Sequence, residues 1–148
     1  MDKHQEARIY EFYLRNIVHA IKQLQDSKLT PYNITNQQAR LLGDIHEQLK
    51  EEKQFCQKDL ERIMNLRGSS ITSLLQGLEK KGFIVRSSGD EDGRTKRLQI
   101  TEKGTKLINE MAEVFQSAES LLLQGMTDDE KEIYKKLLKI SYQNFQRL

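Results

Sequence analysis

The sequence between residues 57 and 101 constrains the fold more than any other part of this chain. It reads as two helices joined by a tight turn at residues 65–68, followed by two short strands joined by a charged loop. Apolar residues in the second helix recur at intervals of three and four, which places them along one stripe of an α-helix: Ile71, Leu74, Leu75 and Leu78. This order of elements predicts a helix-turn-helix followed by a β-hairpin wing.

The opposite face of the second helix carries short, uncharged side chains that form hydrogen bonds: Ser69, Ser70, Thr72, Ser73 and Gln76. Such side chains let a helix backbone come close to a partner, and base edges in the DNA major groove offer matching donors and acceptors. The same residues could form an ordinary solvated face, but Ser and Thr are mediocre helix formers, so their concentration here needs a reason. The pattern predicts a recognition helix that reads the major groove.

The loop between the two strands is a basic finger on a tight turn, because Asp92 and Gly93 form a hairpin signal just before Arg94. An arginine there can enter a minor groove, where narrow A·T tracts concentrate negative potential. Asp92 could pair with Arg94 and fix its direction, and Thr95 and Lys96 are weaker candidates for phosphate contacts. The alternative is a solvated tip whose ion pair contributes roughly 0–1 kcal/mol.

Three further residues are predicted to contact DNA. Arg67 precedes the recognition helix and could reach a phosphate or a guanine, while Gln57 and Lys58 begin the preceding helix and could bind phosphates. The charge distribution supports this. Residues 58–106 hold 11 Lys/Arg against 7 Asp/Glu, an excess of four positive charges, whereas residues 1–57 hold 8 of each.

Amphipathic helices flank the predicted helix-turn-helix and wing at both ends of the chain. The periodicity predicts one helix over residues 5–25, a loop over residues 28–33, and two helices after Thr101 and Thr127. In a two-fold dimer such helices can interdigitate and hold two recognition helices about 34 Å apart, one turn of DNA. We therefore expect a mainly α homodimer with a small β-hairpin wing, its single domain spanning residues 1–148. Residues 34–101 would form the winged helix-turn-helix, and residues 1–30 and 102–148 the dimerisation helices.

The wing sequence resembles that of the MarR family of bacterial transcription regulators. Residues 92–94 (Asp-Gly-Arg) and 98–104 (Leu-Gln-Ile-Thr-Glu-Lys-Gly) are similar to the family's Asp-x-Arg and apolar-x-Leu-Thr-x-x-Gly patterns, and residues 34–38 and 78–84 resemble two other family segments. The resemblance implies a dimeric winged-helix repressor on a pseudo-palindromic operator, often released by small ligands. Two positions depart from the pattern: Gly93 replaces a common basic residue, and Cys56 stands where Thr or Ser commonly opens a helix.

Some residues admit two interpretations. Tyr10, Tyr13, Ile17 and Phe55 could line a pocket for a small aromatic or amphipathic effector, or could serve packing alone. Cys56 could be a redox switch, because a thiol at a helix N-terminus can have a lowered pKa, or simply a small residue tolerated at a cap. His4, His19 and His46 have no second ligand type nearby in sequence, so no metal site or cofactor is expected.

Other functional classes find little support in the sequence. No nucleophile–base arrangement or phosphate loop points to an enzyme. No apolar stretch approaches the roughly 20 residues that span a bilayer, and the N-terminus lacks the apolar core of a signal peptide, so we expect a cytoplasmic protein. The sequence thus predicts a sequence-specific regulator that binds double-stranded DNA. The alternative is a winged-helix module that binds a protein partner and no DNA.

Overall fold

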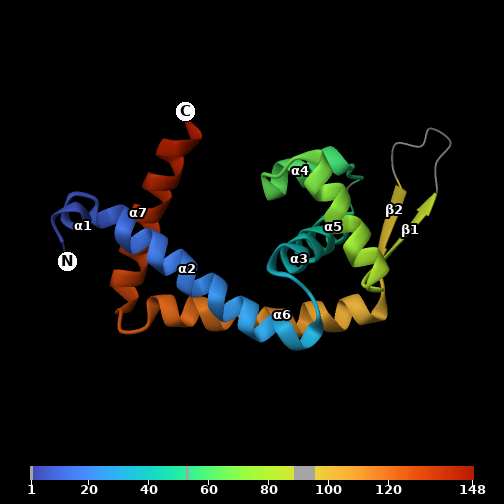
Figure 1. The fold of residues 1–148 in the computed structure, drawn as a ribbon, viewed down its shortest axis with the longest axis horizontal. Coiled ribbons are helices and arrows are strands. Elements are labelled where there is room, and N and C mark those ends of the chain that lie inside the picture. The colour runs from blue at the N-terminus through green and yellow to red at the C-terminus, as the bar shows by residue number, and fades with distance from the viewer. Residues whose placement is uncertain (1, 53, 89–95) are drawn as a thin grey trace.

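The computed structural model describes residues 2–52, 54–88 and 96–148 and shows a mainly α protein with one β-hairpin (Figure 1). In chain order its elements are α1 (Lys3–Ala7), α2 (Ile9–Leu29), the 3₁₀ turn η1 (Thr30–Tyr32), α3 (Asn36–Lys50), α4 (Gln57–Met64), α5 (Gly68–Lys80), β1 (Ile84–Ser88), β2 (Lys96–Ile100), α6 (Glu102–Leu123) and α7 (Asp128–Gln146). This arrangement confirms the predicted fold class. No helix in the described ranges is long and apolar enough to cross a membrane.

The N-terminal helix differs from the sequence-based prediction at both ends. A break at Arg8 separates α1 from α2, and α2 continues to Leu29, past the predicted end near residue 25. The loop predicted over residues 28–33 is therefore wrong at its first two residues. Pro31 ends the α-helix but is accommodated in η1, because proline is tolerated in the first turn of a helix. Burial of Leu29 in the core supports the longer helix.

Helix ends elsewhere follow local capping chemistry. Thr35 forms a capping box with Gln38 at the start of α3, and Thr127 forms another with Glu130 at the start of α7. Gly82 has a φ of 83°, the left-handed conformation in which glycine commonly follows the end of a helix such as α5. The helices predicted after Thr101 and Thr127 begin at those caps.

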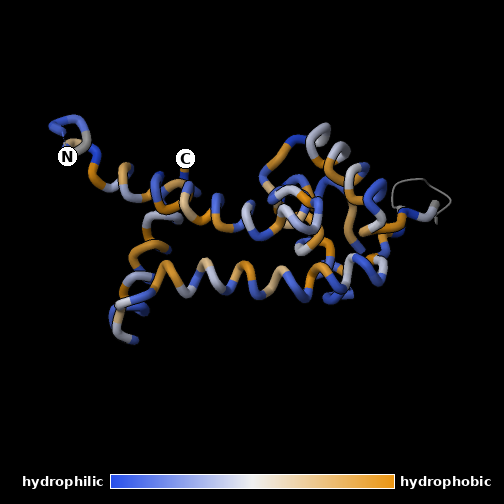
Figure 2. Tube along the Cα trace, turned by 60° about the horizontal axis from the view of Figure 1, so that its bottom comes forward, coloured by the Kyte–Doolittle hydropathy of each residue, from blue (hydrophilic) through white to orange (hydrophobic). Residues whose placement is uncertain are grey.

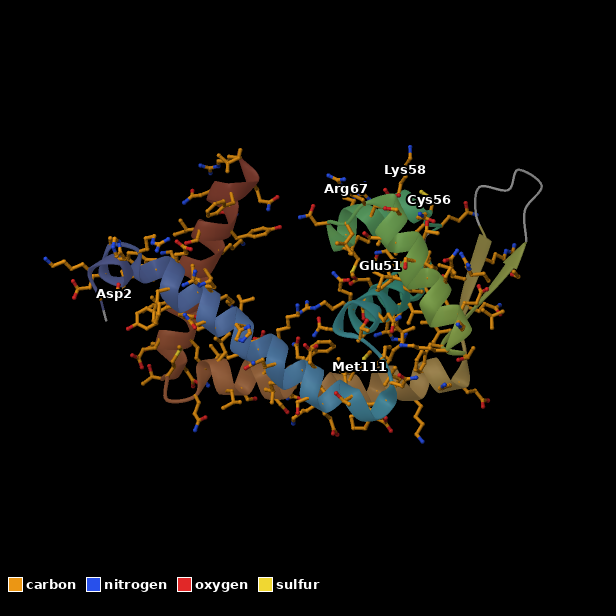
Figure 3. The ribbon with its side chains drawn as sticks, in the orientation of Figure 1. Asp2, Glu51, Cys56, Lys58, Arg67 and Met111 are labelled. Carbon is orange, nitrogen blue, oxygen red and sulfur yellow. The ribbon has the colours of Figure 1, made fainter. Side chains whose placement is uncertain are left out.

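The hydrophobic core lies in the reader, which we define as residues 34–101, and extends onto the first half of α6. Its completely covered side chains include Leu42, Ile45, Ile71 and Leu78. Met111 of α6 belongs to the same cluster and lies below α3 in Figure 3. The core thus joins α5 to the long helix α6.

The opposite end of the molecule has no comparable core. No described residue of α7 is buried, and Figures 1 and 2 show that α7 and the N-terminal part of α2 lie far from the reader. We call α1, the first half of α2 and α7 the arm. Large apolar side chains remain exposed along it: Tyr10, Tyr13, Leu14, Val18, Ile133, Leu137, Leu138, Ile140, Tyr142 and Phe145.

Candidate nucleic-acid interface

Helix α5 buries one face and exposes the other. Ile71, Leu75 and Leu78 pack into the core, while Leu74 packs partly buried against it. The polar side chains singled out in the sequence face outward: Ser69, Ser70, Ser73 and Gln76 are exposed, and Thr72 is half-buried. The structure therefore brings these five residues together on one accessible face of one helix.

Gln57 contacts the candidate recognition helix directly. Its side-chain Nε2 donates hydrogen bonds to the hydroxyl oxygen of Thr72 at 2.8 Å and to the carbonyl oxygen of Gly68 at 3.1 Å. The amide therefore connects the start of α4 to the first turn of α5. Sequence reasoning proposed Gln57 and Thr72 as separate contact residues and missed this link, because no local pattern indicates a contact across 15 residues.

The turn between α4 and α5 brings basic side chains to one surface. Asn65 ends α4 with a φ of 54°, and the backbone N–H of Leu66 donates to the carbonyl oxygen of Glu61 at 3.0 Å. Arg67 directly precedes α5 and is exposed, as is Lys58 in the first turn of α4. Figure 3 shows both side chains at the α4 edge of the reader. Both are therefore free to meet an approaching polyanion.

Cys56 precedes α4 and is partnered by Asp59. The carboxylate of Asp59 accepts hydrogen bonds from the Cys56 backbone N–H at 2.8 Å and from its thiol at 3.4 Å. These bonds lower the pKa of Asp59 below its usual range, and nearby Arg62 lowers it further. Sequence reasoning treated Cys56 as a poor cap and overlooked Asp59 three residues later, the spacing of a capping box.

The wing is anchored to the recognition helix. Strands β1 and β2 pair antiparallel, from Ile84 opposite Ile100 to Ser88 opposite Lys96. Arg86 of β1 forms an ion pair with Glu79 of α5, with Nε and Oε2 2.5 Å apart. Of the predicted wing contacts, Lys96 begins β2, whereas Asp92, Arg94 and Thr95 lie outside the described residues. The pairing and the ion pair hold the two strands against α5.

A close junction joins the wing to α6 and explains the Thr-x-x-Gly pattern. The hydroxyl of Thr101 donates to the carbonyl oxygen of Gly82 at 2.6 Å and accepts from the backbone N–H of Gly104 at 3.1 Å. A Cβ atom at position 104 would lie 2.3 Å from the Phe83 carbonyl oxygen and 2.7 Å from the Ile100 Cγ2 atom. Only glycine allows the backbones to approach this closely.

A second close approach joins α3 to α5. A Cβ atom at position 77 would lie 2.5 Å from the Nε2 atom of Gln38. The Oε1 atom of the same side chain accepts hydrogen bonds from the Lys81 ammonium at 2.8 Å and from the Thr35 backbone N–H at 3.2 Å. Gln38 thus caps α3 and holds the end of the recognition helix.

An open cleft of about 850 Å³ lies between the reader and the long helices. Its apolar lining includes Val18, Ile21, Ile63, Met64, Leu66 and Phe115, and its charged lining is Lys22, Arg40, Asp44 and Glu47. Burial raises the pKa of Asp44, although Arg40 opposes the shift.

None of the four residues proposed for an effector pocket lines this cleft. Tyr10 and Tyr13 are exposed on α2, Ile17 is half-buried, and Phe55 packs against the reader core. The structure therefore does not bring them together around one cavity. Across the described ranges, no group of three His, Cys, Asp or Glu side chains is placed to hold a metal ion.

Comparisons with known proteins agree with this geometry. A model of the MarR family matches residues 32–95. A MarR family regulator structure from Clostridium acetobutylicum is 32% identical, with a TM-score of 0.69 over 94% of this chain and 96% of that one. This chain belongs to the MarR family. The match confirms the resemblance that the wing motif suggested.

Two further MarR family structures resemble the chain over most of its length. MepR from Staphylococcus aureus in complex with DNA is 29% identical, with a TM-score of 0.80 over 92% of this chain and 96% of that one. A MarR family protein from Bacillus stearothermophilus is 29% identical, with a TM-score of 0.71 over 99% of both chains. The likeness therefore includes the helices outside the reader.

Proposed function

We propose that this MarR family member is a transcription regulator that binds double-stranded DNA in a sequence-specific manner as a homodimer. The observation that carries the proposal is the exposed polar face of α5, next to basic residues of α4 and beside an anchored wing. The likeness to MepR in complex with DNA supports it, because it extends over 92% of this chain. Nothing favours the protein-interaction alternative.

Each part of the interface has a distinct role in this proposal. The side chains of Ser69, Ser70, Thr72, Ser73 and Gln76 contact base edges or nearby phosphates in the major groove. Lys58 and Arg67 contact phosphates, and Gln57 sets the position of α5 through Thr72 while lying close enough to join them. Arg94 enters the flanking minor groove, with Asp92 orienting it and Thr95 and Lys96 contacting the backbone.

The arm provides the dimer interface. Its exposed apolar side chains need a partner surface, because contiguous apolar area of this kind is uncommon on monomers. A second copy covers it symmetrically and holds two readers at a fixed spacing, which matches a pseudo-palindromic operator. Repression is the sign of regulation that the resemblance to the MarR family implies.

A small aromatic or amphipathic effector would act on the spacing between readers. A ligand beside α2, α3 and α6 that fits one spacing better than another shifts the population toward it. The cleft's apolar walls and few charged groups suit such a molecule. The participation of Tyr10, Tyr13, Ile17 and Phe55 stays a prediction. Unchanged DNA affinity at saturating concentrations of candidate effectors would contradict this step.

The proposal is tested by selecting duplexes from a random pool and titrating the enriched sequence at several salt concentrations. Wild type should bind with a steep salt dependence, and Arg94→Ala should weaken binding about tenfold and reduce the salt slope by about one. Lys28→Ala, which removes an exposed positive charge from the second half of α2, outside both the reader and the arm, serves as the control and should leave affinity unchanged. No enriched sequence and no duplex binding at low salt would instead support the protein-interaction module.

A further inference from the structure

A polar cluster occupies the corner where the chain passes from α2 into the reader. Gln25 of α2 is only 4% exposed. Its side-chain Oε1 accepts a hydrogen bond from Asn36 Nδ2 at 2.8 Å and a weaker one from Arg40 Nη2 at 3.4 Å. Asn36 and Arg40 both belong to α3, so the cluster connects two helices across the η1 turn.

The cluster also reaches α6. The Nε atom of Arg40 donates to Asn36 Oδ1 at 2.7 Å, and its guanidinium carbon lies 5.9 Å from the ring centre of Phe115 on α6. A cation over an aromatic face at this distance is attracted to it. Three helices therefore meet at one set of directional contacts: α2 and α6, which run toward the arm, and α3, which begins the reader.

Directional contacts restrict this corner more than apolar packing does. Apolar burial is non-directional, whereas a buried amide that loses its partners is costly, so the cluster favours one angle between α2 and α3. Asn36, Arg40 and Phe115 also line the open cleft. A displacement of these side chains would therefore change the contacts among α2, α3 and α6.

We propose that Gln25, with Asn36 and Arg40, is the positioning element that fixes the direction of the reader relative to the long helices. The proposal rests on the DNA-binding function proposed above, because reader direction matters only if two readers must meet two half-sites. Gln25 touches no DNA in this account and acts through α3.

The direct test measures reader direction without DNA. Spin labels at Lys58→Cys on α4 and Glu119→Cys on α6, in a Cys56→Ser background diluted with excess unlabelled chain, report one intramolecular distance distribution. Gln25→Leu should broaden or shift that distribution, because it removes the shared acceptor. Gln25→Glu keeps an acceptor oxygen and should restore the wild-type distribution. Gln23→Leu, an exposed glutamine on the same helix, is the matched control and should change nothing.

Duplex affinity provides the second readout, measured in the same variants without labels and without the labelling substitutions. Gln25→Leu should weaken binding about tenfold, and Gln25→Glu should recover most of the loss. If Gln25→Leu does not fold, Asn36→Ala cuts the same cluster from α3 and should produce the same broadening. A wild-type distance distribution in a folded Gln25→Leu or Asn36→Ala protein would overturn the proposal, whatever the affinity. Absence of duplex binding by wild type would refute the proposed function but leave the distance test decisive.

Discussion

The reader and the arm belong to one chain but differ in how far they bury their apolar side chains. In the reader, Leu60, Ile71 and Leu78 are at most 1% exposed, and two glycines allow close approaches, Gly77 to the Gln38 side chain and Gly104 to the Phe83 backbone. In the arm, Tyr142 is 63% exposed and Phe145 is 73% exposed. The reader core is completed within one chain by the first half of α6, whereas the arm leaves many large apolar side chains exposed.

Helix α7 shows that local signals can specify an element without specifying its packing. Its capping box is complete, and the Thr127 backbone and side chain lower the pKa of Glu130 through hydrogen bonds. Yet an isolated helix of this length is only marginally stable in water, since most helical stability in proteins comes from tertiary contacts. The contrast with the reader agrees with the proposal that a second copy covers the arm.

The largest expected effect comes from disrupting the arm. Leu137→Glu together with Phe145→Glu places charges among exposed apolar side chains of α7 and should convert the dimer to a monomer with a folded reader. Because two linked readers bind far more tightly than one, operator affinity should fall about 100-fold or more. Sedimentation velocity and circular dichroism measure the two properties. Gln143→Glu with Gln146→Glu adds the same charges at polar positions, and an equal loss there would contradict a specific apolar interface.

A smaller effect is expected from the reader junction. Gly104→Ala forces a Cβ atom against the Phe83 carbonyl oxygen, so the free energy of unfolding should fall by about 1–3 kcal/mol. Gly43→Ala on α3 is the matched control, because a Cβ atom there meets nothing within 4 Å. It should raise stability by about 0.5–1 kcal/mol through helix propensity. Denaturant unfolding of both variants checks the prediction, and equal stabilities would disprove the close approach.

The smallest effect compares the two capping carboxylates. The folded-state pKa values of Asp59 in the reader and Glu130 in the arm are both lowered, so each stabilises the fold above its ordinary pKa, near 4. That contribution is lost as pH falls through the lowered pKa. Asp59→Asn and Glu130→Gln should therefore each lower the melting temperature slightly at pH 7, with the difference from wild type shrinking at acidic pH. A difference that grows on acidification would contradict the shifts.

The features that could be predicted from the sequence are those that depend on residues only a few positions apart. The stripe of Ile71, Leu75 and Leu78, the cap at Thr127 and the glycine at position 82 each depend on neighbours within a few residues. Their structures follow from helix geometry and backbone sterics, which act locally. The pairing of Ile84–Ser88 with Lys96–Ile100 similarly confirms the two short strands that were predicted.

The contacts that sequence reasoning missed join residues far apart in the chain. Gln25 with Arg40, Gln57 with Thr72 and Gln38 with Lys81 are pairs of polar residues with no periodic signature. The cleft also could not be located, because its lining combines four helices whose relative placement depends on such contacts. The cleft lies beside Val18 and Ile21 of α2, and a role of the aromatic residues of that helix in effector binding stays a prediction.

The most direct test of the account counts chains on DNA. Native mass spectrometry of wild type with a duplex carrying one selected operator should show two chains per duplex at every subsaturating protein concentration. The Leu137→Glu, Phe145→Glu variant should show weak single occupancy under the same conditions. Tight binding of one wild-type chain, with the affinity of the variant unchanged, would contradict the claim. The reader would then bind DNA without a second copy on the arm.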